Sequence, residues 1–93
     1  MTHEQKHMDK VAQIGCVICR RETGNIVPCH VHHIAEGSGK RSDFMTAGLC
    51  PEHHEGFLGI HGMGSKKWLM MFNLPTEYHL LGLVNEYRAI DGI

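Results

Sequence analysis

The stretch Leu49-Cys50-Pro51-Glu52-His53-His54 decides how we expect this chain to fold. Proline is common at the first position of a helix, so we predict a helix that begins at Pro51. Cys50 and His53 then lie one turn apart on the same side of the helix start. His54 is rotated from His53 by about 100° and faces a different neighbour. We therefore predict that one short helix serves two sites, one on each side.

Two further pairs of metal-ligating side chains complete these sites, because thiolate and imidazole are the ligands that zinc prefers. Cys16-Val-Ile-Cys19 supplies one pair and His32-His33 the other. We predict one closed site and one open site. The ligands of the closed site are Cys16, Cys19, Cys50 and His53, and those of the open site are His32, His54 and His61.

The Cys16–Cys19 pair has two alternative interpretations, a thioredoxin-like redox pair and two buried thiols. The redox pair needs a β-α-β context, which a chain of 93 residues that starts with a predicted helix does not offer. The matching pair at Cys50 and His53 favours a zinc knuckle.

The composition agrees with a small α+β domain stabilised by metal. Ninety-three residues, 42% hydrophobic and 6% aromatic, form a modest core that a bound ion would strengthen. Four cysteines and nine histidines, with no signal sequence, favour metal ligands in a reducing cytosol over disulfides. A net charge of −1 argues against a protein that grips nucleic acid by its own positive charge, and no apolar run could cross a membrane.

We predict a single domain with three parts. Residues 2–14 form an N-terminal helix that starts with a capping box of Thr2 and Gln5. Residues 15–62 hold the zinc knuckle and the metal-binding core, and residues 65–90 form the C-terminal helices, the second of which starts at Pro75.

Within the core, we predict a polar turn over residues 20–28 and strands over 29–34 and 44–49. Alternation in the first strand places His32 and His33 on opposite faces. One of them can then bind metal while the other handles a proton. His30 shares a face with His32 and is expected to be a surface histidine or a neighbour of the metal ligands.

The loop between these strands is rich in glycine and charge. Lys40 and Arg41 either belong to an ordinary solvated loop or contact phosphate, and the two interpretations are about equally weighted. Asp43 could accept a hydrogen bond from a histidine or fix the loop.

His61 can join the open site only if the helix that carries His54 ends early. In one straight helix the two residues would be about 10 Å apart along the axis. Gly56 and Gly59 can end the helix and turn the chain back. Without a break there, His61 becomes a phosphate contact instead.

The order of knuckle, hairpin and helix carrying the second ligand pair is that of a treble-clef zinc fold, whose hairpin and helix form the ββα-metal unit of His-Asn-His (HNH) endonucleases. More narrowly, the chain resembles the phage recombination-enhancement (Ref-type) nucleases, which depend on RecA. The resemblance spans about residues 10–86. The matching residues are Cys16-Val-Ile-Cys19, Val31-His-His-Ile34, Gly37-x-Gly39, Leu49-Cys-Pro-Glu-His-His54, Gly59-Ile-His61-Gly62 and the tail Trp68…Phe72-x-Leu74…Glu77…Leu80-Leu81…Val84.

The resemblance implies roles for these residues. It assigns the structural zinc ligands to the closed site, a catalytic divalent ion (Mg²⁺, Mn²⁺ or Zn²⁺) to His32, His54 and His61, and the general base to His33. His61 would be either the third ligand or a substrate contact. Two departures stand out: the central asparagine of the superfamily has no clear equivalent before Leu49-Cys50, and Asp43 stands where Ref-type chains often have a histidine.

The expected function is therefore metal-dependent hydrolysis of DNA phosphodiester bonds in recombination, by a protein encoded by a phage or prophage and located in the bacterial host cytosol. One alternative is a non-catalytic zinc module that binds DNA or protein. Another is a nuclease that needs a recombinase filament of the RecA type to supply DNA affinity.

Overall fold

The computed structural model describes residues 1–34 and 41–93. Its elements in chain order are α1 (His3–Ile14), α2 (Val17–Thr23), β1 (His30–His33), β2 (Thr46–Leu49), α3 (Pro51–His54), α4 (Ile60–Met63), α5 (Ser65–Met71) and α6 (His79–Asp91). Among the described residues, β1 and β2 form one antiparallel pair, with His30 opposite Leu49 and His33 opposite Thr46. The chain is thus a small α+β domain.

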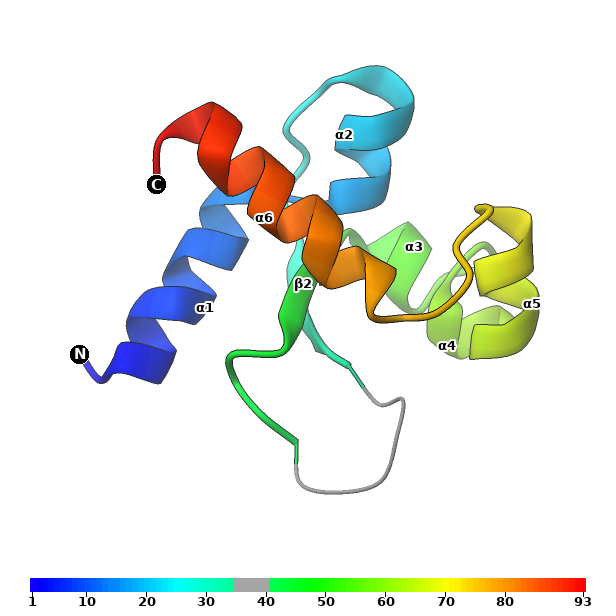
Figure 1. Ribbon diagram of the computed structural model, residues 1–93. Coiled ribbons are helices and arrows are strands. Elements are labelled where there is room, and N and C mark those ends of the chain that lie inside the picture. Colours follow the sequence, from blue (N-terminus) through cyan, green and yellow to red (C-terminus); the bar gives the residue numbers. More distant parts are fainter. Residues whose placement is uncertain (35–40) are drawn as a thin grey trace.

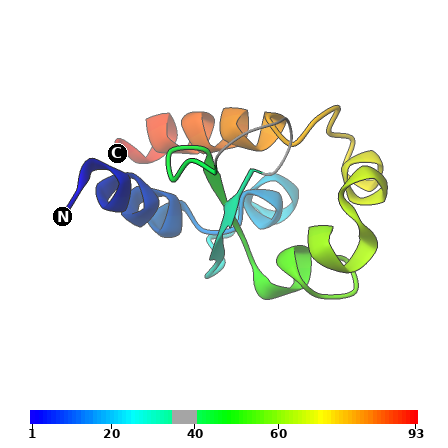
Figure 2. The ribbon, with the colours of Figure 1, turned by 90° about the horizontal axis from the view of Figure 1, so that it is seen from below.

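The helices lie around this hairpin in two groups (Figures 1 and 2). In one group, α1 and α2 each contact α6, and all three helices contact β2; in the other, α3 and α4 follow the end of β2 and lead into α5. Fully buried side chains fill the space between these elements, among them Val11, Ile14, Val17, Ile18, Leu49, Trp68 and Leu80. In the described part of the chain, no helix is both long and apolar enough to span a membrane.

The N-terminal helix forms as predicted. Thr2 Oγ1 accepts from the backbone N–H of Gln5, and the Gln5 side chain accepts from the backbone N–H of Thr2. This reciprocal pair satisfies two donors that a helix start would otherwise leave unpaired. Gly15 ends α1 with a φ of 81°, a conformation in which glycine is favoured.

The predicted polar turn over residues 20–28 is wrong in its first part, because α2 continues to Thr23. Cys16 caps this helix: its Sγ accepts from the backbone N–H of Cys19 at 3.4 Å. Arg20 then binds Asp91 through two contacts, of 2.7 and 3.0 Å, and stacks over Tyr87 on α6. These contacts with α6 stabilise a helix that the local sequence does not indicate.

β1 is one residue shorter at each end than the predicted strand over 29–34, and two other boundaries differ by more. β2 begins at Thr46 instead of residue 44, because a turn closes between Ser42 O and Met45 N at 3.0 Å. The last helix begins at His79 instead of Pro75, because short-range bonds hold residues 76–81 in turns, such as Leu80 N to Glu77 O at 2.9 Å. This turn places Glu77 inside the protein, where it is 4% exposed.

Candidate metal centres

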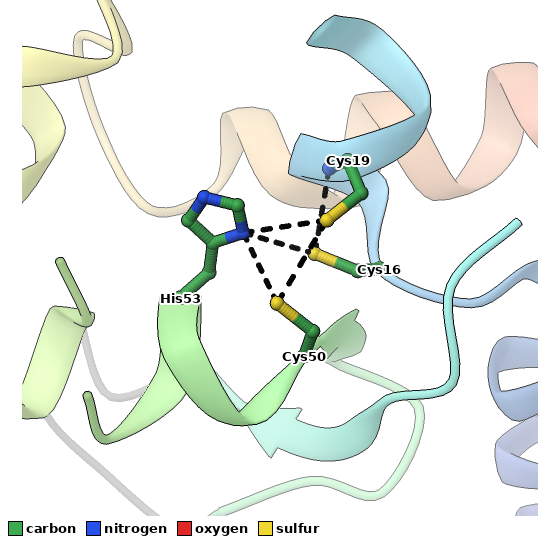
Figure 3. A group of neighbouring side chains, drawn as sticks. All are labelled: Cys16, Cys19, Cys50 and His53. Atoms are coloured by element: carbon green, nitrogen blue, oxygen red, sulfur yellow. Dashed lines mark hydrogen bonds between the residues drawn. The ribbon is translucent and has the colours of Figure 1, made fainter. Parts of the chain in front are cut away.

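The four ligands predicted for the closed site lie together (Figure 3). Cys16 precedes α2 and Cys19 lies within it, while Cys50 and His53 come from the start of α3. Pro51 occupies the first helical position, as predicted, so the side chains of Cys50 and His53 project from one turn towards the α2 pair. We name this group the Cys₃His cluster.

The spacing of the Cys₃His cluster suits a tetrahedral ion. Bond lengths of about 2.3 Å to sulfur and about 2.05 Å to nitrogen place tetrahedral ligands about 3.8 Å apart for two sulfurs and about 3.6 Å apart for sulfur and nitrogen. Cys19 Sγ and Cys50 Sγ are 3.8 Å apart. His53 Nδ1 lies 3.5, 3.5 and 3.2 Å from the sulfurs of Cys16, Cys19 and Cys50. These side chains could hold a metal ion such as zinc.

The electrostatics of the Cys₃His cluster also favour a cation. Burial raises the pKa of the Cys16 thiol, and burial together with the neighbouring thiols raises the pKa of Cys19 to about 12. Thiolates packed this closely are costly unless a cation offsets their charge. Burial lowers the pKa of His53, which favours the neutral, metal-ligating imidazole.

Cys29 lies outside this cluster. Its Sγ is 3.9 Å from the carbonyl oxygen of Ala12, and burial raises its pKa to about 11. This placement agrees with the prediction that Cys29 is a small packed residue.

The second group, His32, His54 and His61, has ligating nitrogens within 4.8 Å of one another, and we name it the His₃ cluster. Its three side chains come from β1, α3 and α4. The ring centroids of His32 and His54 are 5.3 Å apart, and those of His54 and His61 are 4.7 Å apart. The fold therefore brings together three histidines that are not adjacent in the sequence.

The helix break that His61 requires is present. α3 ends at His54, and α4 begins only at Ile60. Glycine makes this reversal feasible, because a Cβ on Gly59 would lie 2.7 Å from the backbone carbon of His54. A Cβ on Gly62 would overlap the carbonyl oxygen of Gly56. The two helices therefore pack closely enough to bring His61 to His54.

Burial and the neighbouring histidines favour the neutral imidazoles of His32 and His54. Burial lowers the pKa of His32, against the opposing effect of the nearby Glu77 carboxylate. Burial, and then His32 and His61, lower the pKa of His54. A neutral ring keeps a lone pair for a metal ion, so both residues are in the ligating form at neutral pH.

A cavity of about 370 Å³ connects the His₃ cluster with the predicted base. Its lining residues are Val31, His32, His33, Ile34, Arg41, His54 and His61. His33 Nε2 lies 2.8 Å from Asp43 Oδ1, so Asp43 does contact a histidine. The Asp43 carbonyl also accepts from Thr46 Oγ1 at 3.0 Å. Lys40 lies outside the described residues, whereas Arg41 faces the same cavity as the histidines.

Two further side chains contact the His₃ cluster: His30, expected as a surface histidine or a neighbour of the metal ligands, and Glu77, whose contact was not found from the sequence. Glu77 Oε1 lies 2.8 Å from His32 Nε2, and His30 Nδ1 lies 3.0 Å from His54 Nδ1. His30, His54 and Glu55 form a third, more exposed group with ligand atoms within 4.8 Å. The alternation of the strand had placed His30 beside His32, but nothing local to Glu77 indicates its partner.

Comparison with known proteins supplies the family. A family model described as "Recombination enhancement, RecA-dependent nuclease" matches residues 1–78, which include both predicted clusters. No curated protein and no solved structure matches the chain. The match covers most of the 93 residues. The chain therefore belongs to the recombination-enhancement, RecA-dependent nuclease family.

Proposed function

We propose that this protein is a metal-dependent DNA endonuclease of the HNH type, with a treble-clef, ββα-metal core. The observation that carries the proposal is the shared cavity in which the His₃ cluster, His33 and Arg41 meet. The Cys₃His cluster would hold a structural Zn²⁺ on the other side of α3. The family description, which names a nuclease, supports the same activity.

His33 is suited to act as the general base. If Nε2–H donates to the Asp43 carboxylate at 2.8 Å, Nδ1 keeps its lone pair and can take a proton from an attacking water. The same bond fixes the orientation of the ring. General-base catalysis contributes roughly 10²–10⁴ in rate, so loss of His33 should lower activity by that factor.

His32, His54 and His61 would hold the catalytic divalent cation, which is Mg²⁺, Mn²⁺ or Zn²⁺. When bound, such an ion would supply Lewis-acid stabilisation of the charge on the phosphate and on the leaving 3′ oxygen. Arg41, on the wall of the same cavity, is placed to pair with a phosphate oxygen. Lys40 is its neighbour in sequence and is proposed as a second phosphate contact.

The proposed substrate is DNA held with help from a partner. The net charge of −1 gives the chain little non-specific attraction for DNA. The family description names dependence on RecA, and a recombinase filament of that type would present the strand to the cavity. We therefore propose a RecA-type filament as the partner.

A plasmid-nicking assay tests the activity. The wild type should nick supercoiled DNA with Mg²⁺ or Mn²⁺ and lose activity in EDTA. His33→Ala should keep the wild-type zinc content and cut about 10²–10⁴ times more slowly. His3→Ala, which changes an exposed histidine at the start of α1, is the matched control and should cut normally. Equal rates for His33→Ala and the wild type would refute the assigned base.

A second arm tests the dependence on a partner. Cleavage of DNA is measured with and without RecA-type filaments assembled on single-stranded DNA. We expect the filament to increase the rate. If the wild type binds DNA but cuts under neither condition, the alternative of a non-catalytic zinc module is favoured instead.

A further inference from the structure

A buried hydrogen bond joins the C-terminal part of the chain to the His₃ cluster. Glu77 Oε1 lies 2.8 Å from His32 Nε2, across 45 residues of sequence. The side chains are 6% and 3% exposed. Glu77 comes from the turn before α6, whereas His32 lies in β1. The contact therefore links two elements that are far apart in the chain.

The burial of the Glu77 carboxylate calls for a physical explanation. Removing it from water costs several kcal/mol in typical cases unless hydrogen bonds compensate. One group that faces it is His32, a side chain of the His₃ cluster. An apolar residue in the same turn would fill the space without this cost, so the carboxylate is not explained by packing alone.

The contact also determines which nitrogen of His32 can bind an ion. When Nε2–H donates to Glu77, the lone pair of the ring is on Nδ1. A histidine that ligates a metal commonly donates its other N–H to a carboxylate, which fixes the ring and makes the ligand more basic. The rings of His54 and His61 both lie 5.3 Å from that of His32 by their centroids.

We propose that Glu77 is a positioning residue that orients His32 for metal binding. The inference rests on the proposed function for one point, the catalytic role of the bound ion. The effect of Glu77 on metal binding can be measured without any nuclease assay. The turn that precedes α6 then helps to position a metal ligand, in addition to packing against the hydrophobic core.

Binding of Ni²⁺ tests the proposal, because imidazole binds this ion well. Protein with zinc bound in the Cys₃His cluster is titrated with Ni²⁺ by calorimetry at a temperature well below unfolding. Zinc content and far-UV circular dichroism are recorded for each variant. His32→Ala defines the affinity that remains when the His₃ cluster is incomplete, including binding at the exposed group of His30, His54 and Glu55.

Glu77→Ala should weaken Ni²⁺ binding by about 10–100-fold, the range found when such outer carboxylates are removed. Glu77→Gln keeps an acceptor oxygen but not the charge, so its loss should be smaller. Glu86→Gln, on the exposed side of α6, is the matched control and should bind Ni²⁺ like the wild type. In the His32→Ala background, Glu77→Gln should have no further effect.

The outcomes separate this proposal from the proposed function. Wild-type Ni²⁺ affinity in both folded Glu77 variants would overturn the role of Glu77. If Glu77→Ala does not fold, Glu77→Gln decides: weaker binding supports the role, and unchanged binding overturns it. Weaker binding in a wild-type protein that never cuts DNA would support the role while the nuclease proposal fails.

Discussion

Replacing Cys19 by serine should abolish zinc binding and destabilise the whole domain. Cys19 is half-buried, so the substitution removes a metal ligand with little direct loss of core packing. Its sulfur is one corner of the Cys₃His cluster, 3.5 Å from His53 Nδ1 and 3.8 Å from Cys50 Sγ. A serine hydroxyl is a poor substitute for a thiolate at such a corner.

The expected effect is large relative to the total stability. At roughly 0.05–0.15 kcal/mol per residue, a chain of 93 residues has a free energy of unfolding of roughly 5–14 kcal/mol. Structural zinc sites contribute about 10–16 kcal/mol of apparent binding free energy. Even a loss of about 3 kcal/mol would lower the Tm by about 12–24 °C in a domain of this size.

The assay is thermal unfolding by circular dichroism together with the zinc content of the purified protein. Cys29→Ser is the matched control, because Cys29 is also a half-buried cysteine but lies outside the cluster. It should retain one zinc per chain and nearly the wild-type Tm. A zinc-free Cys19→Ser protein that melts at the wild-type temperature would refute the structural role of the cluster.

Three further predictions concern packing and the proposed base. Trp68→Ala removes a fully buried ring whose Nε1 donates to Leu58 O at 2.9 Å, and should cost about 3–5 kcal/mol in urea unfolding; a loss below 1 kcal/mol would contradict this. Gly48→Ala should strongly destabilise the fold, because the added Cβ would lie 2.6 Å from Cys29 Sγ. Gly82→Ala is the control: the added Cβ meets open space on α6, and the free energy of unfolding should rise by up to about 1 kcal/mol. Equal melting temperatures for the two variants would argue against this packing. Asp43→Asn should lower plasmid nicking without loss of zinc, because His33 loses its charged partner; unchanged rates would remove Asp43 from the mechanism.

The directions in which the ligands of the two clusters point were predictable, because each direction is set by local structure. A proline after Cys50 starts a helix, and the helix period then sends His53 and His54 in different directions. Strand alternation likewise placed His30 and His32 on one face, and both rings now lie near His54. These rules need only neighbouring residues, so a sequence is sufficient to apply them.

The features of the fold and the site that the sequence did not predict depend on contacts between residues far apart in the chain. Helix α2 gains its last turn from Arg20, whose partner Asp91 is 71 positions away. The Glu77–His32 contact spans 45 positions and joins the turn before α6 to β1. No local periodicity reports such pairs, which is why the start of the last helix and the partner of His32 were found only in the structure.

The most direct test of the central idea, two ions on opposite sides of α3, is anomalous X-ray scattering at the zinc edge from crystals grown with Zn²⁺. We predict one peak within bonding distance of the Cys₃His cluster and a second within bonding distance of the His₃ cluster. A second peak bound only by His30, His54 and Glu55, or no second peak, would contradict the account.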